Sequence, residues 1–228
     1  MKPFLTTLLL AFSLFTFFSC RKSNPVNPVD ASTIKQLWPI QVGNTWVMQY
    51  TELDTSGNIL YSSYDTLIVT RDTIIFISKL IDSTFYEVSG SFGSLRTPDS
   101  FSPFGGLMAP SRNGSFVVLT YTVLTNGFMA STYGYYVYPA GVGDYNTGSP
   151  GPRRTQSIDT TIAVPQGTHS CYEYEYFHGD PSNGVVTRKD FLSVGIGPVQ
   201  SELYNYIDTS SSRMYCSARW QLVSLNLK

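Results

Sequence analysis

Apolar and polar residues alternate with a period of two along most of this 228-residue chain. In the segment 43–52, Trp46, Met48 and Tyr50 fall on one face and the residues between them fall on the other. Successive side chains of a β-strand point to opposite faces of a sheet, so this period predicts strands. No stretch shows a sustained period of 3.6 residues with capping residues at its ends. Any helix is therefore expected to be short.

Turn signals divide the alternating chain into roughly ten predicted strands. Asp54–Asn58 separates two of them, and Asn126-Gly127 is a strong hairpin signal. Further turn signals lie at 165–168, 179–184, 195–198 and 208–212. The pattern predicts an all-β fold, with a single curved antiparallel sheet in the form of a meander-rich half-barrel or open barrel. A sheet of this size is expected to curl or close because unpaired edges are a liability.

The first residues follow a different pattern. Lys2 is followed by an apolar run, 4–18, which is the plan of a secretory signal and is shorter than the roughly 20 residues that span a bilayer. Ser19 precedes Cys20, an arrangement that resembles a bacterial lipoprotein signal, in which residues 1–19 are removed and the cysteine is acylated. The alternatives are ordinary cleavage after the apolar run and an uncleaved anchor.

The segment after Cys20 predicts a tether. Ser23–Ser32 contains two Asn-Pro steps and no aromatic residue, and proline favours extended backbone at itself and at its predecessor. We therefore expect a signal peptide at 1–19, a lipid-anchored tether at 20–36 and one β domain at 37–228. This organisation places the protein in the cell envelope of a Gram-negative bacterium, with an acylated anchor in the outer membrane. The sequence leaves open which face of that membrane it occupies.

Composition excludes one class of partner and raises the question of a disulfide. Charged residues and aromatic residues each make up 14% of the chain, and the net charge is −1. Without a basic patch or stripe, nucleic-acid binding is not expected. Cys171 and Cys216 remain after Cys20, and in an oxidising compartment such a pair can form a disulfide. The alternative is two buried thiols that never meet.

A segment rich in Gly, Pro and Ser, 89–115, also contains recurrent large apolar residues. Long irregular loops in compact domains are usually functional or disordered, and the apolar content argues against disorder. The segment is expected to be a loop packed over the sheet as a lid, or else a plain surface insertion.

Candidate catalytic groups are sparse. The two histidines, His169 and His178, have no zinc-binding helix motif around them, so no metal site and no cofactor are predicted. Glu173 and Glu175 share one face of one strand and could act as a carboxylate pair on a sugar. The favoured interpretation is a solvated face opposite three tyrosines, because one wet face is the default for antiparallel sheets. No catalytic residue is predicted, and we do not expect an enzyme.

Three phrases of the chain resemble known bacterial proteins. Residues 38–50, WPIQVGNTWVMQY, resemble the opening of the mature domain in bacterial envelope lipoproteins of unknown function. Residues 162–176, IAVPQGTHSCYEYEY, and 191–205, FLSVGIGPVQSELYN, resemble those lipoproteins and also the TapB-like family of β-rich envelope proteins. The likeness is thin between Ser91 and Gly151. It implies a curved antiparallel sheet and implies no reaction.

Two function classes follow. In the favoured one, the concave face of the sheet binds a hydrophobic or glycan ligand. The predicted residues of this ligand face and its lid are Trp46, Met48, Tyr50, Phe101, Phe104, Leu107, Met108 and Trp220. In the other class, the concave face is filled by its own side chains and the protein is a structural or partner-binding scaffold of the envelope. An open apolar cavity above about 300 Å³ would favour the first. The sequence identifies no protein partner.

Overall fold

The computed structural model describes residues 37–78, 81–89, 106–110, 116–124, 127–146, 152–179, 184–207 and 213–228. The chain divides into two units, Met1–Thr33 and Ile34–Lys228, and every described residue belongs to the second. The predicted signal peptide, the lipid attachment point at Cys20 and the predicted tether lie outside the described residues.

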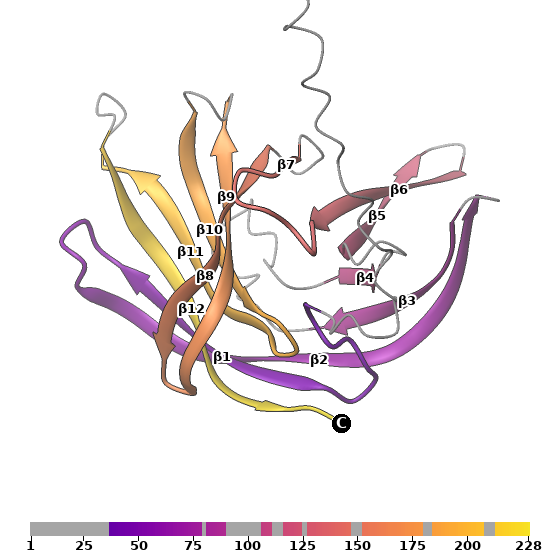
Figure 1. The fold of residues 1–228 in the computed structure, drawn as a ribbon, viewed down its shortest axis with the longest axis horizontal. Helices are drawn as coiled ribbons and strands as arrows, with labels where there is room; N and C mark the ends of the chain where they lie inside the picture. The colour runs from indigo at the N-terminus through magenta and orange to yellow at the C-terminus, as the bar shows by residue number, and fades with distance from the viewer. Residues whose placement is uncertain are drawn as a thin grey trace, which may run out of the picture. The chain divides into compact units, whose positions relative to one another are not determined.

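Twelve β-strands make up the regular structure of the described residues, which contain no helix. They are β1 (Thr45–Leu53), β2 (Ile59–Ser78), β3 (Ile81–Ser89), β4 (Gly106–Pro110), β5 (Phe116–Leu124), β6 (Gly127–Tyr136), β7 (Tyr145–Asn146), β8 (Arg153–Val164), β9 (Gly167–His178), β10 (Val185–Ser193), β11 (Gly197–Tyr206) and β12 (Met214–Asn226). All belong to one antiparallel sheet, in the order β6-β5-β4-β3-β2-β1-β12-β11-β10-β9-β8-β7 (Figure 1). The predicted fold class is confirmed.

The sheet joins two meanders through the first and last strands of the chain. β1 pairs with β2 on one side and with β12 on the other. Each other neighbouring pair is consecutive along the chain, which makes local hairpins the main building unit. Because β6 and β7 stand at opposite ends of the order, the sheet is open rather than closed into a barrel.

The predicted lid is partly a strand. Leu107 and Met108 belong to β4, where they pair with β3 on one side and with β5 on the other. The expectation of one irregular loop over 89–115 is therefore wrong for this part. Leu107-Met108-Ala109 is a short apolar run, and such a run can join a ladder even when glycine and proline surround it. Phe101 and Phe104 lie outside the described residues.

The sheet curls strongly. The backbone N–H of Gln166, in the turn between β8 and β9, donates to the carbonyl of Leu222 on β12 at 3.1 Å, although β10 and β11 separate these strands in the sheet. From the other end, the hydroxyl of Tyr136 at the end of β6 donates to Asp190 on β10 at 2.9 Å. Both contacts cross the concave face, so this face is largely filled by the sheet's own elements.

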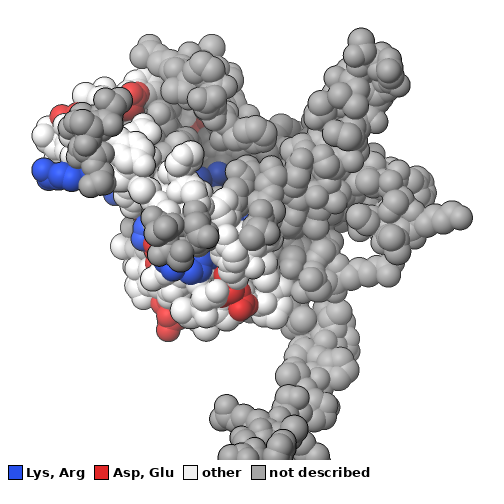
Figure 2. Space-filling view, turned by 90° about the horizontal axis from the view of Figure 1, so that it is seen from above, with Lys and Arg blue, Asp and Glu red and all other residues white. Residues whose placement is uncertain are grey.

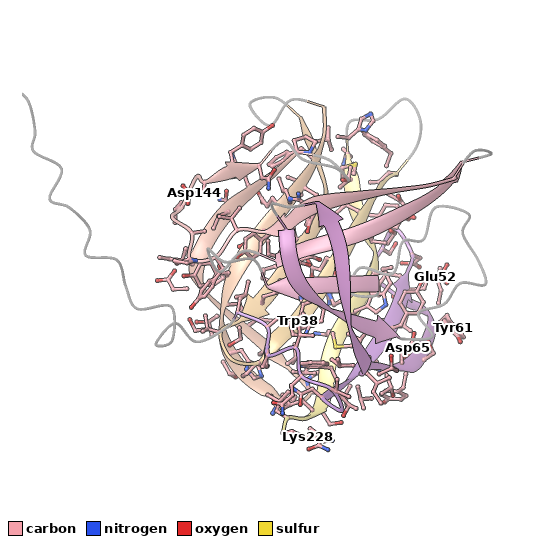
Figure 3. The ribbon with its side chains drawn as sticks, turned by 90° about the vertical axis from the view of Figure 1, so that its right-hand side faces the viewer. Trp38, Glu52, Tyr61, Asp65, Asp144 and Lys228 are labelled. Atoms are coloured by element: carbon pink, nitrogen blue, oxygen red, sulfur yellow. The ribbon has the colours of Figure 1, made fainter. Side chains whose placement is uncertain are left out.

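The core lies on this concave face, and the segment just before β1 fills its centre. Leu37 and Trp38 are completely buried, and Figure 3 labels Trp38. The ring of Trp38 packs edge-on against Trp46 at a centroid distance of 5.8 Å. The indole N–H of Trp46 donates to the carbonyl of Ile196 at 2.6 Å. Gly43, with a φ of +91°, allows the turn that leads into β1.

The outer face carries a row of charged side chains that alternate in sign. One residue from each of five adjacent strands contributes to this row: Arg154, Glu175, Lys189, Glu202 and Arg219, each opposite the next in the register. Opposite charges directly across antiparallel strands stabilise the sheet by roughly 0.2–1 kcal/mol per pair. Figure 2 shows basic and acidic side chains interspersed with uncharged ones on the described surface.

Candidate functional site

The predicted ligand-face residues of β1 and β12 do lie on one face of the sheet, but they are packed within the core. Trp46 and Met48 are completely buried and Trp220 is 8% exposed. Tyr50 is half-buried, with its ring 5.0 Å from that of Trp220. A ligand could reach Trp46 or Met48 only by displacing side chains of the core, such as Trp38. The apolar part of the concave face is therefore sealed by the chain itself.

An open hollow of about 410 Å³ lies over β9 and its neighbours β8 and β10. Its lining residues are Ile158, Thr168, His169, Ser170, Tyr172, Ser193 and Val194. We call the hollow lined by these residues the β9 hollow. Three elements build it: β9 contributes the central residues, β8 contributes Ile158, and the end of β10 with its following turn contributes Ser193 and Val194.

A break in strand pairing makes room for the hollow. Ser157 on β8 is opposite Glu173, but the next aligned pair is Thr160 with Cys171, so the register shifts between them. Ile158 therefore lies in a bulged part of β8 opposite Tyr172, and it is 41% exposed. Bulges bend the strand that carries them and redirect its side chains, and they are frequent beside functional sites.

Tyr172 anchors the hollow to a series of tyrosine rings. Its ring lies 5.4 Å from Tyr138 in an edge-on geometry and 6.2 Å from Tyr174 in a stacked geometry. The Tyr174 ring is 5.0 Å from Tyr136, and its hydroxyl donates to the carbonyl of Val137 at 2.8 Å. These contacts fix the orientation of Tyr172, a half-buried residue that also lines the hollow.

The polar groups of the β9 hollow are neutral. Among the described residues, its lining includes no Lys, Arg, Asp or Glu. Burial lowers the pKa of His169, and its Nε2 lies 2.6 Å from the side-chain oxygen of Gln166. Burial, together with the neighbouring Tyr138, raises the pKa of Tyr172. At neutral pH the hollow thus presents hydroxyls and an uncharged imidazole.

Glu173 and Glu175 are on the face opposite the tyrosines of β9, as alternation predicts, but they are buried rather than solvated. Lys189 lies between them, with its Nζ 2.8 Å from Glu173 and 2.9 Å from Glu175. Burial acts to raise the pKa of Glu175, but hydrogen bonds from Lys189 and Arg154 outweigh it, so that pKa is lowered. A carboxylate held in its ionised form is a poor proton donor.

The two thiols do not form the disulfide that the sequence allows. Cys171 and Cys216 are both free in the structure, which corrects that expectation. Cys171 is on β9 and Cys216 on β12, with β10 and β11 between these strands in the sheet. Cys171 is completely buried against Phe191 and Val199, and burial raises its pKa to about 12.

A buried ionic cluster around Asp190 is a feature that the sequence did not predict. Asp190 is completely buried, and its Oδ1 accepts hydrogen bonds from Arg188 Nε at 2.8 Å and from Ser201 Oγ at 2.6 Å. Its Oδ2 accepts from Tyr136 and from Arg188 Nη2. The Arg188 guanidinium also lies over the Tyr176 ring, 4.7 Å from its centroid. This cluster ties β6, β10 and β11 together on the concave face.

Arg188 and Asp190 share a face of β10 with the core residue Leu192. Polar residues at these inward positions are the sequence signal from which the buried cluster could have been predicted. Because every carboxylate oxygen already accepts from donors within the chain, the cluster is a structural tie rather than a ligand site.

Within the described part of the chain, no group of three or more His, Cys, Asp or Glu side chains could hold a metal ion. The same residues contain no helix with the length and hydropathy needed to cross a membrane.

Comparisons with known proteins give two distant structural similarities. No protein-family model matches the sequence, and no curated protein matches it significantly. A candidate lipoprotein from Parabacteroides distasonis has a TM-score of 0.45 and 14% identity, over 85% of this chain and 99% of that one. A candidate exported protein with a YmcC-like fold from Bacteroides fragilis has a TM-score of 0.44 and 14% identity, over 85% of this chain and 100% of that one. Similarity at this level assigns no family.

Proposed function

We propose that the chain is an exported lipoprotein, acylated at Cys20, whose β domain binds a neutral saccharide in the β9 hollow. The observation that carries the ligand part is the chemistry of the hollow: a tyrosine held by its neighbours, hydroxyls and an imidazole, with no charged side chain among the lining residues that the structure describes. The observation that carries the anchor is the apolar run that ends at Ser19-Cys20.

A saccharide fits this lining better than a lipid. The ring face of Tyr172 is an apolar surface on which the C–H face of a sugar can stack, and aromatic side chains commonly combine such a face with a polar tip. Thr168, Ser170 and Ser193 each carry a hydroxyl that can both donate and accept. A long acyl chain needs an enclosed apolar cavity, whereas the apolar interior here is already packed. Of the two predicted ligands, the glycan is therefore favoured.

The test is a glycan array probed with the full chain and with two variants. Ser170→Trp places a large ring in the hollow at an exposed position, and Ser224→Trp is its control on β12, exposed and outside the lining. The proposal expects wild type and Ser224→Trp to retain the same neutral glycans and Ser170→Trp to lose them. Retention by Ser170→Trp, or a preference for acidic glycans in the wild type, would contradict it.

The anchor has its own test. Cells that express the full chain would be fed a clickable fatty acid, alongside cells that express Cys20→Ala. Label on the wild type and its absence from the variant are expected. An unlabelled wild type would refute the acylation but would leave glycan binding open, so the two parts of the proposal fail separately.

We also infer a binding role rather than a catalytic one. In the residue pair that could have served as acid and base, Glu175 is held ionised by Lys189 and Arg154. Incubation of the full chain with the glycans it retains, followed by mass spectrometry of the glycans, should return them unchanged. Any cleaved product that disappears in Glu175→Gln would overturn this inference.

A further inference from the structure

The start of β9 has a backbone edge that borders the β9 hollow. On one side, 167–171 pairs with β8 in an unbroken register. On the other side, the pairing of β9 with β10 ends where Tyr172 lies opposite Leu192. The chain then turns at 194–196 and returns as β11, so β10 goes no further. Among the described residues, which include all of this turn, no strand pairs with 167–171 on that side.

Strand geometry decides which backbone groups of β9 face this gap. Successive residues of a strand within an antiparallel sheet direct their N–H and C=O groups alternately to the two neighbouring strands. The N–H of Phe177 donates to the carbonyl of Pro152 on the β8 side. The carbonyl of Tyr176 accepts from the hydroxyl of Thr187 on the β10 side. Even-numbered residues of β9 therefore direct their backbone groups toward β10, and odd-numbered ones toward β8.

Thr168 and Ser170 are the even-numbered residues beyond the end of β10. Both are exposed and both line the hollow, together with Ser193 and Val194 from the opposite side of the gap. Among the described residues, neither backbone makes a hydrogen bond across the gap. Such an edge binds amide groups through its N–H and C=O groups. Two edge residues span roughly 7 Å, which suits one or two amides rather than a whole added strand.

We propose that the saccharide of the β9 hollow carries an N-acetylamino group, an inference that rests on the proposed function. The acetamido group is a single neutral amide, and its carbonyl accepts a hydrogen bond from the backbone N–H of Ser170. Its methyl group packs against Ile158 and Val194, the two aliphatic residues of the lining. The sugar ring stacks on Tyr172.

A saccharide that carries only hydroxyl groups fits this lining less well. Its hydroxyls can bond with the serine and threonine side chains, but it has no methyl group to place against Ile158 and Val194. The bulge in β8 leaves Ile158 41% exposed, so apolar surface is available there for burial. Burial of a methyl group and a hydrogen bond to the strand edge each add affinity. The hollow should therefore discriminate between sugars that differ only in this group.

Isothermal titration of the full chain with two matched trisaccharides tests the inference. Tri-N-acetylchitotriose and cellotriose share linkage and ring configuration and differ in the acetamido group at carbon 2 of each sugar. The acetylated trisaccharide should bind at least about tenfold more tightly, because cellotriose lacks both contacts. Equal binding of the two, or no binding of the acetylated one, would overturn the inference. The proposed function would still stand if other neutral glycans were lost in Ser170→Trp, and would fail with the inference if no glycan bound.

A backbone variant tests the hydrogen bond itself. Proline has no N–H, and the N–H of Ser170 takes no part in the ladder with β8, so Ser170→Pro removes the proposed donor at a position that tolerates proline. Thr161→Pro is the matched control, because Thr161 is exposed opposite Ser170 on β8, outside the lining, and directs its N–H away from β9. Ser170→Ala removes the hydroxyl and keeps the N–H.

The ratio of the two affinities is the measured quantity. The preference for the acetylated trisaccharide should disappear in Ser170→Pro and persist in Thr161→Pro, whereas Ser170→Ala should weaken both ligands and keep their ratio. A preference that survives Ser170→Pro, or that Ser170→Ala abolishes, would refute the backbone contact. The blocked peptide acetyl-Ala-Ala-Ala-amide is a third ligand, which offers amides without a sugar. Tighter binding of this peptide than of the acetylated trisaccharide would assign the edge to a peptide strand and overturn the proposal.

Discussion

Gly197→Ala tests whether the segment before β1 is a fixed part of the core. Gly197 has a φ of +90°, and an added Cβ would lie 2.5 Å from Cδ1 of Trp38 and 3.0 Å from its Cγ. Trp38 is completely buried and packed against Trp46, so its ring cannot move aside without disturbing the core. Gly195 lies in the same turn with a φ of +78°, but a Cβ there meets nothing within 4 Å. Gly195→Ala is therefore a control for backbone strain alone.

The two glycine variants are expected to lose different amounts of free energy of unfolding. The left-handed conformation costs a non-glycine residue about 1–2 kcal/mol. Overpacking of a well-filled core typically costs a further ~1–3 kcal/mol. Gly195→Ala should thus lower the free energy of unfolding by about 1–2 kcal/mol, and Gly197→Ala by about 2–5 kcal/mol, from the two preceding costs together.

Urea unfolding of the full chain, followed by tryptophan fluorescence, measures both losses. A Trp38→Ala background adds a stricter comparison, because removal of the ring should reduce the cost of Gly197→Ala to that of Gly195→Ala. Equal losses for the two glycine variants in the wild-type background would refute the reasoning. So would a Gly197→Ala cost that Trp38→Ala leaves unchanged, since Trp38 would then not be the group that the new Cβ meets.

Three further predictions concern buried polar groups. Tyr136→Phe should lower the free energy of unfolding by about 1–3 kcal/mol in the same urea assay, since Asp190 loses a buried donor, whereas Tyr145→Phe at an exposed position should change it little. The pKa of Glu175 is lowered in the folded state, so its ionised carboxylate stabilises the fold above its ordinary pKa, and this stabilisation is lost as the pH falls through the folded-state pKa. Glu175→Gln should therefore flatten the fall in the urea midpoint between about pH 5 and 3. Because burial raises the pKa of Cys171 to about 12, iodoacetamide at pH 8 should leave it unmodified in the native chain and modify it in urea, as read by peptide mass spectrometry; rapid native labelling would contradict its burial.

Most of the fold could be predicted from the sequence because the period of two is a local signal. The Asp54–Asn58 turn, the Asn126-Gly127 hairpin and the glycines at 195 and 197 all mark reversals that the structure contains. Each depends on residues adjacent in the chain, where backbone preferences act directly.

What could not be predicted depends on contacts between distant segments. The curl of the sheet places Tyr136 beside Asp190, which is 54 residues away in the sequence, and no local sequence pattern predicts that contact. For the same reason Trp46 and Met48 could be assigned to one face, but not to a sealed core. The β9 hollow was also missed, because it arises from a register shift in β8 that depends on how two strands align.

Isothermal titration of the full chain with the neutral oligosaccharide that binds best on the array tests the central claim most directly. The account predicts saturable binding to the wild type, a loss of affinity of at least tenfold in Ser170→Trp, and unchanged affinity in Ser224→Trp. Binding that is equally strong in all three proteins would place the saccharide outside the β9 hollow. No binding to the wild type would contradict the proposed function itself.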